Sequence, residues 1–258
     1  MCANVVPIIE VSRLVKEFGA GRAPLRALDE VSFAVDKGRF VTLVGPSGCG
    51  KSTLLQILAG LTAATSGEAR IEGERVCGPM PGKVGMVFQD PTLLPWKTAF
   101  ANVEFPLDLR GDDRPARRKR CAALLELVGL AEFADHYPHE LSGGMRQRVA
   151  IARGLAQDPK LILMDEPFAA LDEQTRTRMG HDLLDIWAET GKTVFFITHS
   201  LSEAIYLSDA VLVMSPRPGR IIDTIAIDFP RPRELDIIGS AAFGAIRNRI
   251  WHLVSEAR

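Results

Sequence analysis

The chain has 258 residues, 47% of them hydrophobic, and a formal net charge of −1 at pH 7. This length and composition are sufficient for a globular protein with a sizeable buried core. The near-neutral charge excludes a field that would draw the whole molecule to nucleic acid or to an anionic bilayer, so a membrane role would need a protein partner.

The chain also lacks the patterns of membrane spans and secretion signals. Its longest apolar candidate, Ile237 to Ile246, is shorter than the roughly 20 residues of a spanning helix and is interrupted by glycine and serine. Met1 to Ile9 has no basic start followed by a long apolar run. No C-x-x-C spacing occurs among the cysteines, which are Cys2, Cys49, Cys77 and Cys121. We therefore expect a soluble protein of the reducing cytoplasm.

The first apolar strand, Phe40 to Val44, runs directly into a glycine-rich loop. The loop fits G-x-x-x-x-G-K-[ST] and consists of Gly45, Pro46, Ser47, Gly48, Cys49, Gly50, Lys51, Ser52 and Thr53. Glycines allow backbone N–H groups to turn inward around β- and γ-phosphates. Lys51 supplies a positive charge to the phosphate oxygens, and Ser52 supplies a hydroxyl for Mg²⁺. The pattern predicts a nucleotide site, and its alternative is a glycine-rich turn without a ligand.

The next part of the chain, residues 99–157, has the apolar spacing of helices and predicts a helical lobe. The basic run Arg114 to Arg120 follows two aspartates. A solvated helix start is favoured for it over a phosphate-binding patch, and we assign it no function.

A second glycine-rich segment lies at the end of this lobe, from Leu141 to Arg148, and opens a helix through Leu155. The N–H groups of that helix start, with the Ser142 hydroxyl and the glycines Gly143 and Gly144, would form an anion site. Taken alone, a Ser-Gly-Gly run is more often only a helix cap.

The apolar strand Leu161 to Met164 ends in two carboxylates, Asp165 and Glu166. Parallel sheets bind ligands at the C-terminal edge of their strands, so both acids are expected there. Asp165 is a candidate Mg²⁺ ligand, and Glu166 a candidate group for polarising the attacking water. The alternative is that the acids cap the following segment.

Two further strands are predicted at Val194 to Thr198, which His199 follows, and at Val211 to Met214. Strands that alternate with helices imply a parallel sheet covered on both faces. The proline-rich tail after Ser215 predicts turns and an extended connection before a last helix near Ala242 to Val254.

The phosphate loop and the Leu141–Arg148 segment together resemble the ATP-binding cassette (ABC) family. This resemblance implies an α/β P-loop NTPase fold, with a mostly parallel core sheet, an N-terminal antiparallel β region and the inserted helical lobe. It implies an ATPase domain over residues 8–240, with the lobe at about 99–157, and a C-terminal helical tail over 241–258. The implied cofactors are ATP and Mg²⁺.

The same resemblance implies roles for isolated residues. Gln89 matches the Q-loop glutamine that reaches Mg²⁺ and water, His199 the switch histidine that contacts the γ-phosphate, and Asp165 the Walker B aspartate. Asp172 matches the D-loop aspartate, and Phe18 the aromatic that stacks on adenine, with a core phenylalanine as its alternative. The chain departs from the family pattern at Ser200, where aspartate is common, and at Ala169, where serine is frequent.

The implied partners are a second copy of the chain and transmembrane permease subunits. In the family, each signature segment faces the γ-phosphate bound to the other chain, and the ATPase lies peripherally on the cytoplasmic face of the inner membrane. The segments Leu93–Trp96 and Asn102–Val103 resemble the surface that receives the membrane subunit, whereas a core tryptophan is the alternative for Trp96. A solute-binding protein is an indirect partner, and nucleic acid is not expected.

The chain resembles most the ATPases of bacterial importers for nitrate, sulfonate and taurine. This resemblance rests on Leu93–Trp96, Pro167–Asp172, Pro216–Ile221 and Pro230–Arg233. Importers of pyrimidine precursors or riboflavin share the group and stay open as alternatives. The alternative from another class is a soluble, non-transport ABC ATPase, which usually has two cassettes or a long coiled-coil insertion. A phosphate-loop kinase would not need the signature segment.

Overall fold

We describe the chain from a computed structural model, which covers residues 7–19 and 24–256. Cys2, most of the segment Met1–Ile9 and the end of the predicted C-terminal tail, 257–258, lie outside the described residues. The chain divides into two compact units. The first contains Met1–Met80 and Thr193–Arg258, and the second contains Pro81–Lys192.

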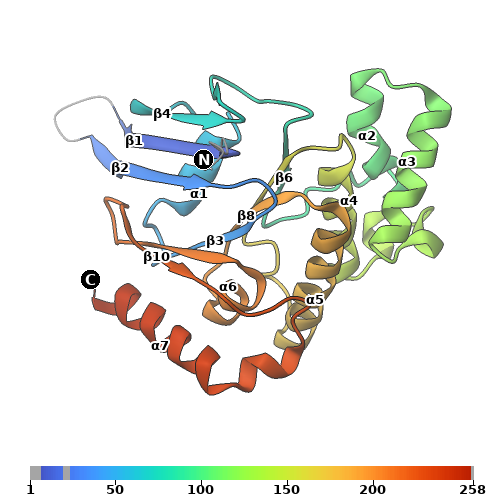
Figure 1. Cartoon of the computed structure of the whole chain (residues 1–258). Helices are drawn as coiled ribbons and strands as arrows, with labels where there is room; N and C mark the ends of the chain where they lie inside the picture. Colours follow the sequence, from blue (N-terminus) through green and yellow to red (C-terminus); the bar gives the residue numbers. More distant parts are fainter. Residues whose placement is uncertain (1–6, 20–23, 257–258) are drawn as a thin grey trace, which may run out of the picture. The chain divides into compact units, whose positions relative to one another are not determined.

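An antiparallel sheet of four strands lies in the first unit, in the order β2-β1-β4-β5. Figure 1 shows β1 between β2 and β4. Its strands are β1 (Ile9–Phe18), β2 (Leu25–Val35), β4 (Ser66–Ile71) and β5 (Glu74–Arg75). Irregularities interrupt the β1–β2 register between Val11 and Glu17, and they increase the local twist. The predicted N-terminal antiparallel β region is confirmed.

The first unit also contains the strands β3 (Phe40–Val44), β8 (Thr193–Ile197), β9 (Ala210–Met214) and β10 (Ile221–Ala226). β3 lies between β8 and β9 and is parallel to both, whereas β10 is antiparallel to β9. Every residue of β3 and β8 is buried, which explains their mostly apolar sequences. The predicted strands are confirmed to within a residue, but β10 was not predicted from the proline-rich tail.

Helices complete the first unit. α1 (Lys51–Leu58) contacts β2 and β4, and α6 (Leu201–Leu207) contacts β3 and β9. The predicted last helix is α7 (Ala241–Glu256), which packs on α6 and β9 and follows the short helix η3 (Leu235–Gly239). The apolar run predicted at Ile237 to Ile246 is thus divided between two helices. Among the described residues, no helix combines the length and the apolar character needed to cross a membrane.

The second unit pairs the strands β6 (Val84–Val87) and β7 (Leu161–Asp165) in parallel. Its helices are α2 (Ala99–Arg110), α3 (Arg114–Leu127), η1 (Ala131–Phe133), η2 (Pro138–Glu140), α4 (Gly143–Leu155) and α5 (Glu173–Thr190). Helices α2, α3 and α4 pack against one another, so the helical stretch predicted at residues 99–157 is confirmed (Figure 1).

The basic run Arg114 to Arg120 forms the first turns of α3. The Ala116 N–H donates to the carboxylate of Asp113, which caps the helix. Arg117 forms ion pairs with Glu104 and Asp108. The predicted solvated helix start is therefore confirmed.

The tail segment Pro230–Arg233 holds the C-terminal end of α6. The guanidinium of Arg233 is 3% exposed and donates to buried carbonyls of the chain, which are those of Ile205, Tyr206, Ser208, Ile227 and Phe229. Neighbouring Arg231 donates to the Leu207 carbonyl and to Asp209. Burial lowers the pKa of Arg233 to about 10, so it remains charged at neutral pH. A buried cation thus satisfies the carbonyls that the end of a helix leaves unpaired.

We predict that Arg233→Met destabilises the chain by about 3 kcal/mol, because it removes charge-assisted hydrogen bonds from several buried carbonyls. Arg233→Lys should cost less, since an ammonium keeps the charge but has fewer donors. Urea unfolding measures both, with Arg247→Ala as the control because Arg247 is exposed on α7. A Met variant that unfolds at the wild-type urea concentration would contradict this role.

Candidate functional site

The phosphate loop leaves the C-terminal end of β3 and enters α1 without any intervening structure. Gly48 and Gly50 have φ values of 75° and 110°, in the left-handed region that favours glycine. A Cβ at Gly50 would also lie 2.9 Å from the Ala27 carbonyl oxygen, so a larger residue would displace the loop. Ser47 and Gly48 are exposed at the tip of the loop, whereas Cys49 is buried beneath it.

The Lys51 side chain closes over the inside of this loop. Its ammonium donates to the carbonyls of Gly45 at 2.9 Å and of Pro46 at 3.1 Å. It also lies 3.9 Å from the sulfur of Cys49, and burial raises the pKa of that thiol. The buried cation is therefore held inside the loop by neutral groups, which leaves its charge available to an anion.

The start of α1 is the second electrostatic element of the loop. Its N-cap is Gly50, and no side chain of the described residues caps it. The first N–H groups of a helix have no partner within the helix, and the helix dipole places positive charge there. Ser52 is exposed in this first turn, and Thr53 is half-buried next to it. These features are those of a phosphate-binding helix start.

His199 lies at the same edge of the sheet as the phosphate loop. β3 and β8 are parallel, with Leu43 opposite Ile197, so Gly45 and His199 each follow the paired residues by two positions. His199 is exposed. Ser200, which stands where the family often has aspartate, caps α6 by accepting from the Glu203 N–H. The departure at Ser200 thus has a local structural role.

Phe18 ends β1 and is 41% exposed, so it does not belong to the core. The ammonium of Lys16 lies 4.8 Å from the centre of its ring. The alternative of a core phenylalanine is therefore wrong. An exposed ring of this kind can stack on a nucleotide base with little preference for its identity.

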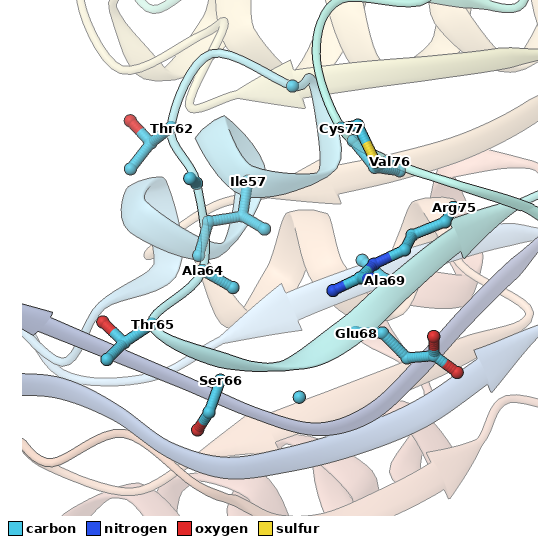
Figure 2. A pocket seen from close by; sticks show the side chains of 13 residues that line it. Ile57, Thr62, Ala64, Thr65, Ser66, Glu68, Ala69, Arg75, Val76 and Cys77 are labelled. Atoms are coloured by element: carbon cyan, nitrogen blue, oxygen red, sulfur yellow. The ribbon is translucent and has the colours of Figure 1, made fainter.

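A cavity of about 230 Å³ lies beyond the end of α1 (Figure 2). Its walls include Ile57 of α1, Ala64 of the following loop, Arg75 of β5 and Cys77 after β5. None of the phosphate-loop residues lines it. This cavity is therefore separate from the predicted nucleotide site.

In the second unit, the parallel pair of β6 and β7 brings Gln89, Asp165 and Glu166 to one edge. Val87 lies opposite Met164, so Gln89 and Glu166 each follow the paired residues by two positions. Glu166 has a φ of 43°, which is a strained conformation for a residue with a side chain. Backbone strain at a carboxylate on the ligand-binding edge of a sheet is typical of a functional position.

The signature segment forms the N-terminal turn of α4. Ser142 is the N-cap and accepts a hydrogen bond from the Met145 N–H at 3.3 Å. Further along the helix, buried Gln147 donates to the Phe88 carbonyl at 3.4 Å. Ser142 thus acts as a helix cap, as the simpler interpretation predicts, and it also stays exposed at a helix start that attracts anions.

Asp172 is exposed and caps α5. Its carboxylate accepts from the Thr175 N–H at 2.9 Å, and this hydrogen bond lowers its pKa. Arg176 donates to the carbonyls of Phe168 and Leu171 and so fixes the preceding loop. These hydrogen bonds hold the D-loop against the start of α5.

Two cavities in the second unit gather the predicted residues. One of about 460 Å³ is lined by Gln89, by Gly143 and by Leu171 of the D-loop. The other, of about 380 Å³, is lined by Ser142 and Gly144 together with Arg178 of α5. Residues that are distant in the sequence, at positions 89, 143 and 171, thus share one concave surface.

The loop after Gln89 is held by two side chains that sequence reasoning did not assign to this task. Asn102 is buried, accepts from the Leu94 N–H and donates to the carbonyls of Leu94, Lys97 and Thr98. Arg153 donates to the carbonyls of Pro91 and Thr92. No sequence pattern indicates that Asn102 or Arg153 binds these carbonyls.

This loop presents Trp96, which is 71% exposed, so the alternative of a core tryptophan is wrong. The expectation for Asn102–Val103 is also wrong, because both residues are buried in α2 and cannot form part of a surface. Asn102 supports the surface from below. The exposed side chain and its fixed backbone leave Trp96 available as an apolar anchor.

Each unit contains some of the oxygen donors that the family would use for Mg²⁺. They are the Ser52 hydroxyl in the first unit, and the Gln89 amide and the Asp165 carboxylate in the second. Hydroxyl, amide and carboxylate oxygens suit Mg²⁺, which keeps several waters and needs few protein ligands. The described residues contain no cluster of His, Cys, Asp and Glu that would hold a metal ion by itself.

Comparisons with known proteins identify the family of the chain. The model of the ABC transporter family matches residues 28–169. An uncharacterized ABC transporter ATP-binding protein of Methanocaldococcus jannaschii is 50% identical over 96% of this chain and 91% of its own length. A protein of Burkholderia pseudomallei named as the taurine import ATP-binding protein TauB is 48% identical over 90% of this chain and 85% of its own length. A protein of the same name from Rhizobium johnstonii is 51% identical over 80% of this chain and 79% of its own length.

Solved structures show the same fold. The ATP-binding cassette MJ0796, in a dimeric post-hydrolysis state bound to ADP and Pi, is 34% identical, with a TM-score of 0.74 over 86% of this chain and 100% of that one. A second dimeric structure of the same cassette has a TM-score of 0.75. The phosphate loop, the signature helix and the matched family model all indicate the same family. The chain therefore belongs to the ABC transporter family and is an ATP-binding subunit with ATPase activity.

Proposed function

We propose that the chain is the energy-coupling subunit of a bacterial-type importer for a small solute, of the nitrate, sulfonate and taurine group. The observation that carries this proposal is the identity of 48–51% to proteins named as taurine import ATPases, over 80–90% of the chain. An importer of a pyrimidine precursor or of riboflavin remains the alternative, because the ATPase does not contact the solute.

We assign roles to the site residues as part of this proposal. Lys51 and the start of α1 bind the β- and γ-phosphates, and Phe18 stacks on adenine. Ser52, Asp165 and Gln89 would hold Mg²⁺, which when bound neutralises developing charge on the phosphates. Glu166 accepts a proton from the attacking water, and His199 orients the γ-phosphate.

The same proposal includes a dimer that closes around two molecules of Mg-ATP. Ser142, Gly143 and Gly144 lie at an exposed helix start in each chain, and they would bind the γ-phosphate held by the phosphate loop of the other chain. Asp172 would border the same nucleotide from the D-loop. The dimeric structures of the related cassette support this arrangement.

The membrane partner in this proposal is a transmembrane permease. This chain would bind the permease at the cytoplasmic face of the membrane, as a peripheral subunit. Exposed Trp96, on a loop that Asn102 holds rigidly, supports this docking surface. Because a ligand shifts an equilibrium only by its different affinity for two states, ATP must favour the closed dimer and ADP the open one. A solute-binding protein would take part only through the permease.

We predict that Glu166→Gln retains ATP binding but slows hydrolysis by about 100-fold or more, because the attacking water loses its proton acceptor. With Mg-ATP the variant should accumulate as a dimer, which phosphate release and light scattering measure together. Glu173→Gln, an exposed acid at the start of α5, is the matched control and should behave as wild type. A Glu166→Gln chain that stays monomeric at high concentration with its membrane partner present would refute the closed dimer.

Mixing two inactive variants tests whether each site uses both chains. Lys51→Ala removes the phosphate-loop charge, and Ser142→Arg blocks the signature, so each variant alone should lose about 100-fold in rate. In an equimolar mixture, the loop of one variant meets the intact signature of the other, and ATPase activity should return above either variant alone. If the mixture stays as inactive as its components, the composite site is wrong.

The transport role is tested by purifying tagged Glu166→Gln chain from native membranes with Mg-ATP and identifying the bound proteins by mass spectrometry. We expect a stoichiometric multi-span membrane protein, and its companion binding protein would indicate the solute. Lys51→Ala, which cannot close around ATP, is the control. Ribosomal or DNA-associated proteins without a membrane protein would replace the importer by a soluble ABC ATPase.

A further inference from the structure

The loop between β9 and β10 touches the outer side of the phosphate loop. Gly219 in this loop donates to the Ala27 carbonyl at 2.9 Å, and its own carbonyl accepts from the Asp29 N–H at 3.0 Å. A Cβ at Gly219 would lie 2.2 Å from the carbonyl oxygen of Cys49. Only glycine can therefore bring this loop so close to the backbone that holds the phosphates.

The β2 segment Ala27–Asp29 contacts both this loop and the start of α1. It forms the hydrogen bonds to Gly219, and a Cβ at Gly50 would lie 2.8 Å from the Leu28 side chain and 2.9 Å from the Ala27 carbonyl oxygen. A displacement of this segment would therefore reach the phosphate loop directly, because closely packed backbone cannot absorb it.

An ionic chain fixes the same segment. The buried carboxylate of Asp29 accepts from Arg220 and, at 2.8 Å, from Arg26. The hydrogen bond from Arg220, with the charges of both arginines, holds the pKa of Asp29 below its usual value. A buried carboxylate without such partners would be costly, so these contacts determine where Asp29 can lie.

The ionic chain continues to the end of β1. Arg26 donates to Glu17 at 2.8 Å, and Glu17 adjoins Phe18. The backbone of Glu17 donates to the Thr65 hydroxyl at 2.9 Å, and Lys16 donates to the Ala63 carbonyl at 2.8 Å. Thr65 and Ala63 belong to the wall of the separate cavity in Figure 2, so β1 is anchored on this side as well.

We propose that Arg220 and Asp29 are positioning residues for ATP. Through Gly219 and Ala27–Asp29 they hold the outer side of the phosphate loop, and through Arg26 and Glu17 they hold the end of β1 that carries Phe18. One ion pair at the β9–β10 loop thereby keeps both nucleotide-binding segments of this unit in place. Neither residue touches the nucleotide. The inference rests on ATP binding by this phosphate loop, and not on the transported solute.

The test measures ATP affinity and the kinetics of hydrolysis for Arg220 variants of the full chain. Arg220→Ala should raise both the Kd of a fluorescent ATP analogue and the KM for ATP by roughly threefold to thirtyfold, the range found for residues that couple to a site without touching it. The kcat should change by less than about twofold, since the catalytic groups are untouched. Arg220→Lys keeps a charge for Asp29 and should recover part of the affinity.

A matched control is available in the same unit. Arg249 pairs with Asp223 at 2.9 Å, and its side chain is 60% exposed, compared with 63% for Arg220. Arg249→Ala should leave the Kd and the KM for ATP unchanged. If Arg249→Ala weakens ATP binding as much as Arg220→Ala does, the effect is one of general stability and the proposal is wrong.

A double-mutant cycle tests whether Arg220 acts through Asp29. Asp29→Asn should weaken ATP binding, and Arg220→Ala should then add little, because its partner charge is already gone. Additive effects would overturn the proposed route, as would wild-type affinity in Arg220→Ala. If the phosphate loop does not bind ATP at all, the result is different. The wild-type chain would then bind ATP no more tightly than the Lys51→Ala variant does.

Discussion

The phosphate site that we propose depends on the uncapped start of α1. No side chain of the described residues caps this helix, its N-cap is a glycine at φ 110°, and the ammonium of Lys51 is held by carbonyls at 2.9 and 3.1 Å. Such a helix start has affinity for anions because its N–H groups and its dipole point the same way. The parallel pairing of β3 with β8 and β9 fixes where the loop begins, so the sheet determines the position of the proposed phosphate site.

In the second unit, parallel strand pairing also determines where acidic and amide side chains lie. Because Val87 of β6 pairs with Met164 of β7, Gln89 and Glu166 each lie two residues beyond the paired residues. The other helix starts differ from that of α1, since α4 and α5 are capped by Ser142 and Asp172. Of these three helix starts, only that of α1 is formed by backbone alone, which is what the close approach of a polyphosphate requires.

Much of this arrangement could be predicted from the sequence. The buried strands β3, β7, β8 and β9 are mostly apolar runs, and a glycine-rich loop after such a strand has few other interpretations. β10 was missed because its sequence lies between prolines and is only partly buried. Asn102 and Arg233 were missed for a different reason: each satisfies backbone carbonyls that only the folded chain brings together. Composition and spacing contain no signal for such contacts.

The contact between Asp29 and Arg220 also has no signal in the sequence, because only the folded chain brings these two residues together. Exposed ion pairs usually contribute little to stability, and Arg220 is largely exposed. Asp29 is buried, however, so its carboxylate cannot exchange its arginine partners for water without a cost. Loss of the pair therefore has a cost in stability as well as in geometry. Nucleotide affinity, compared with that of a chain lacking an equally exposed arginine of the same unit, is the quantity that separates the positioning effect from this cost in stability.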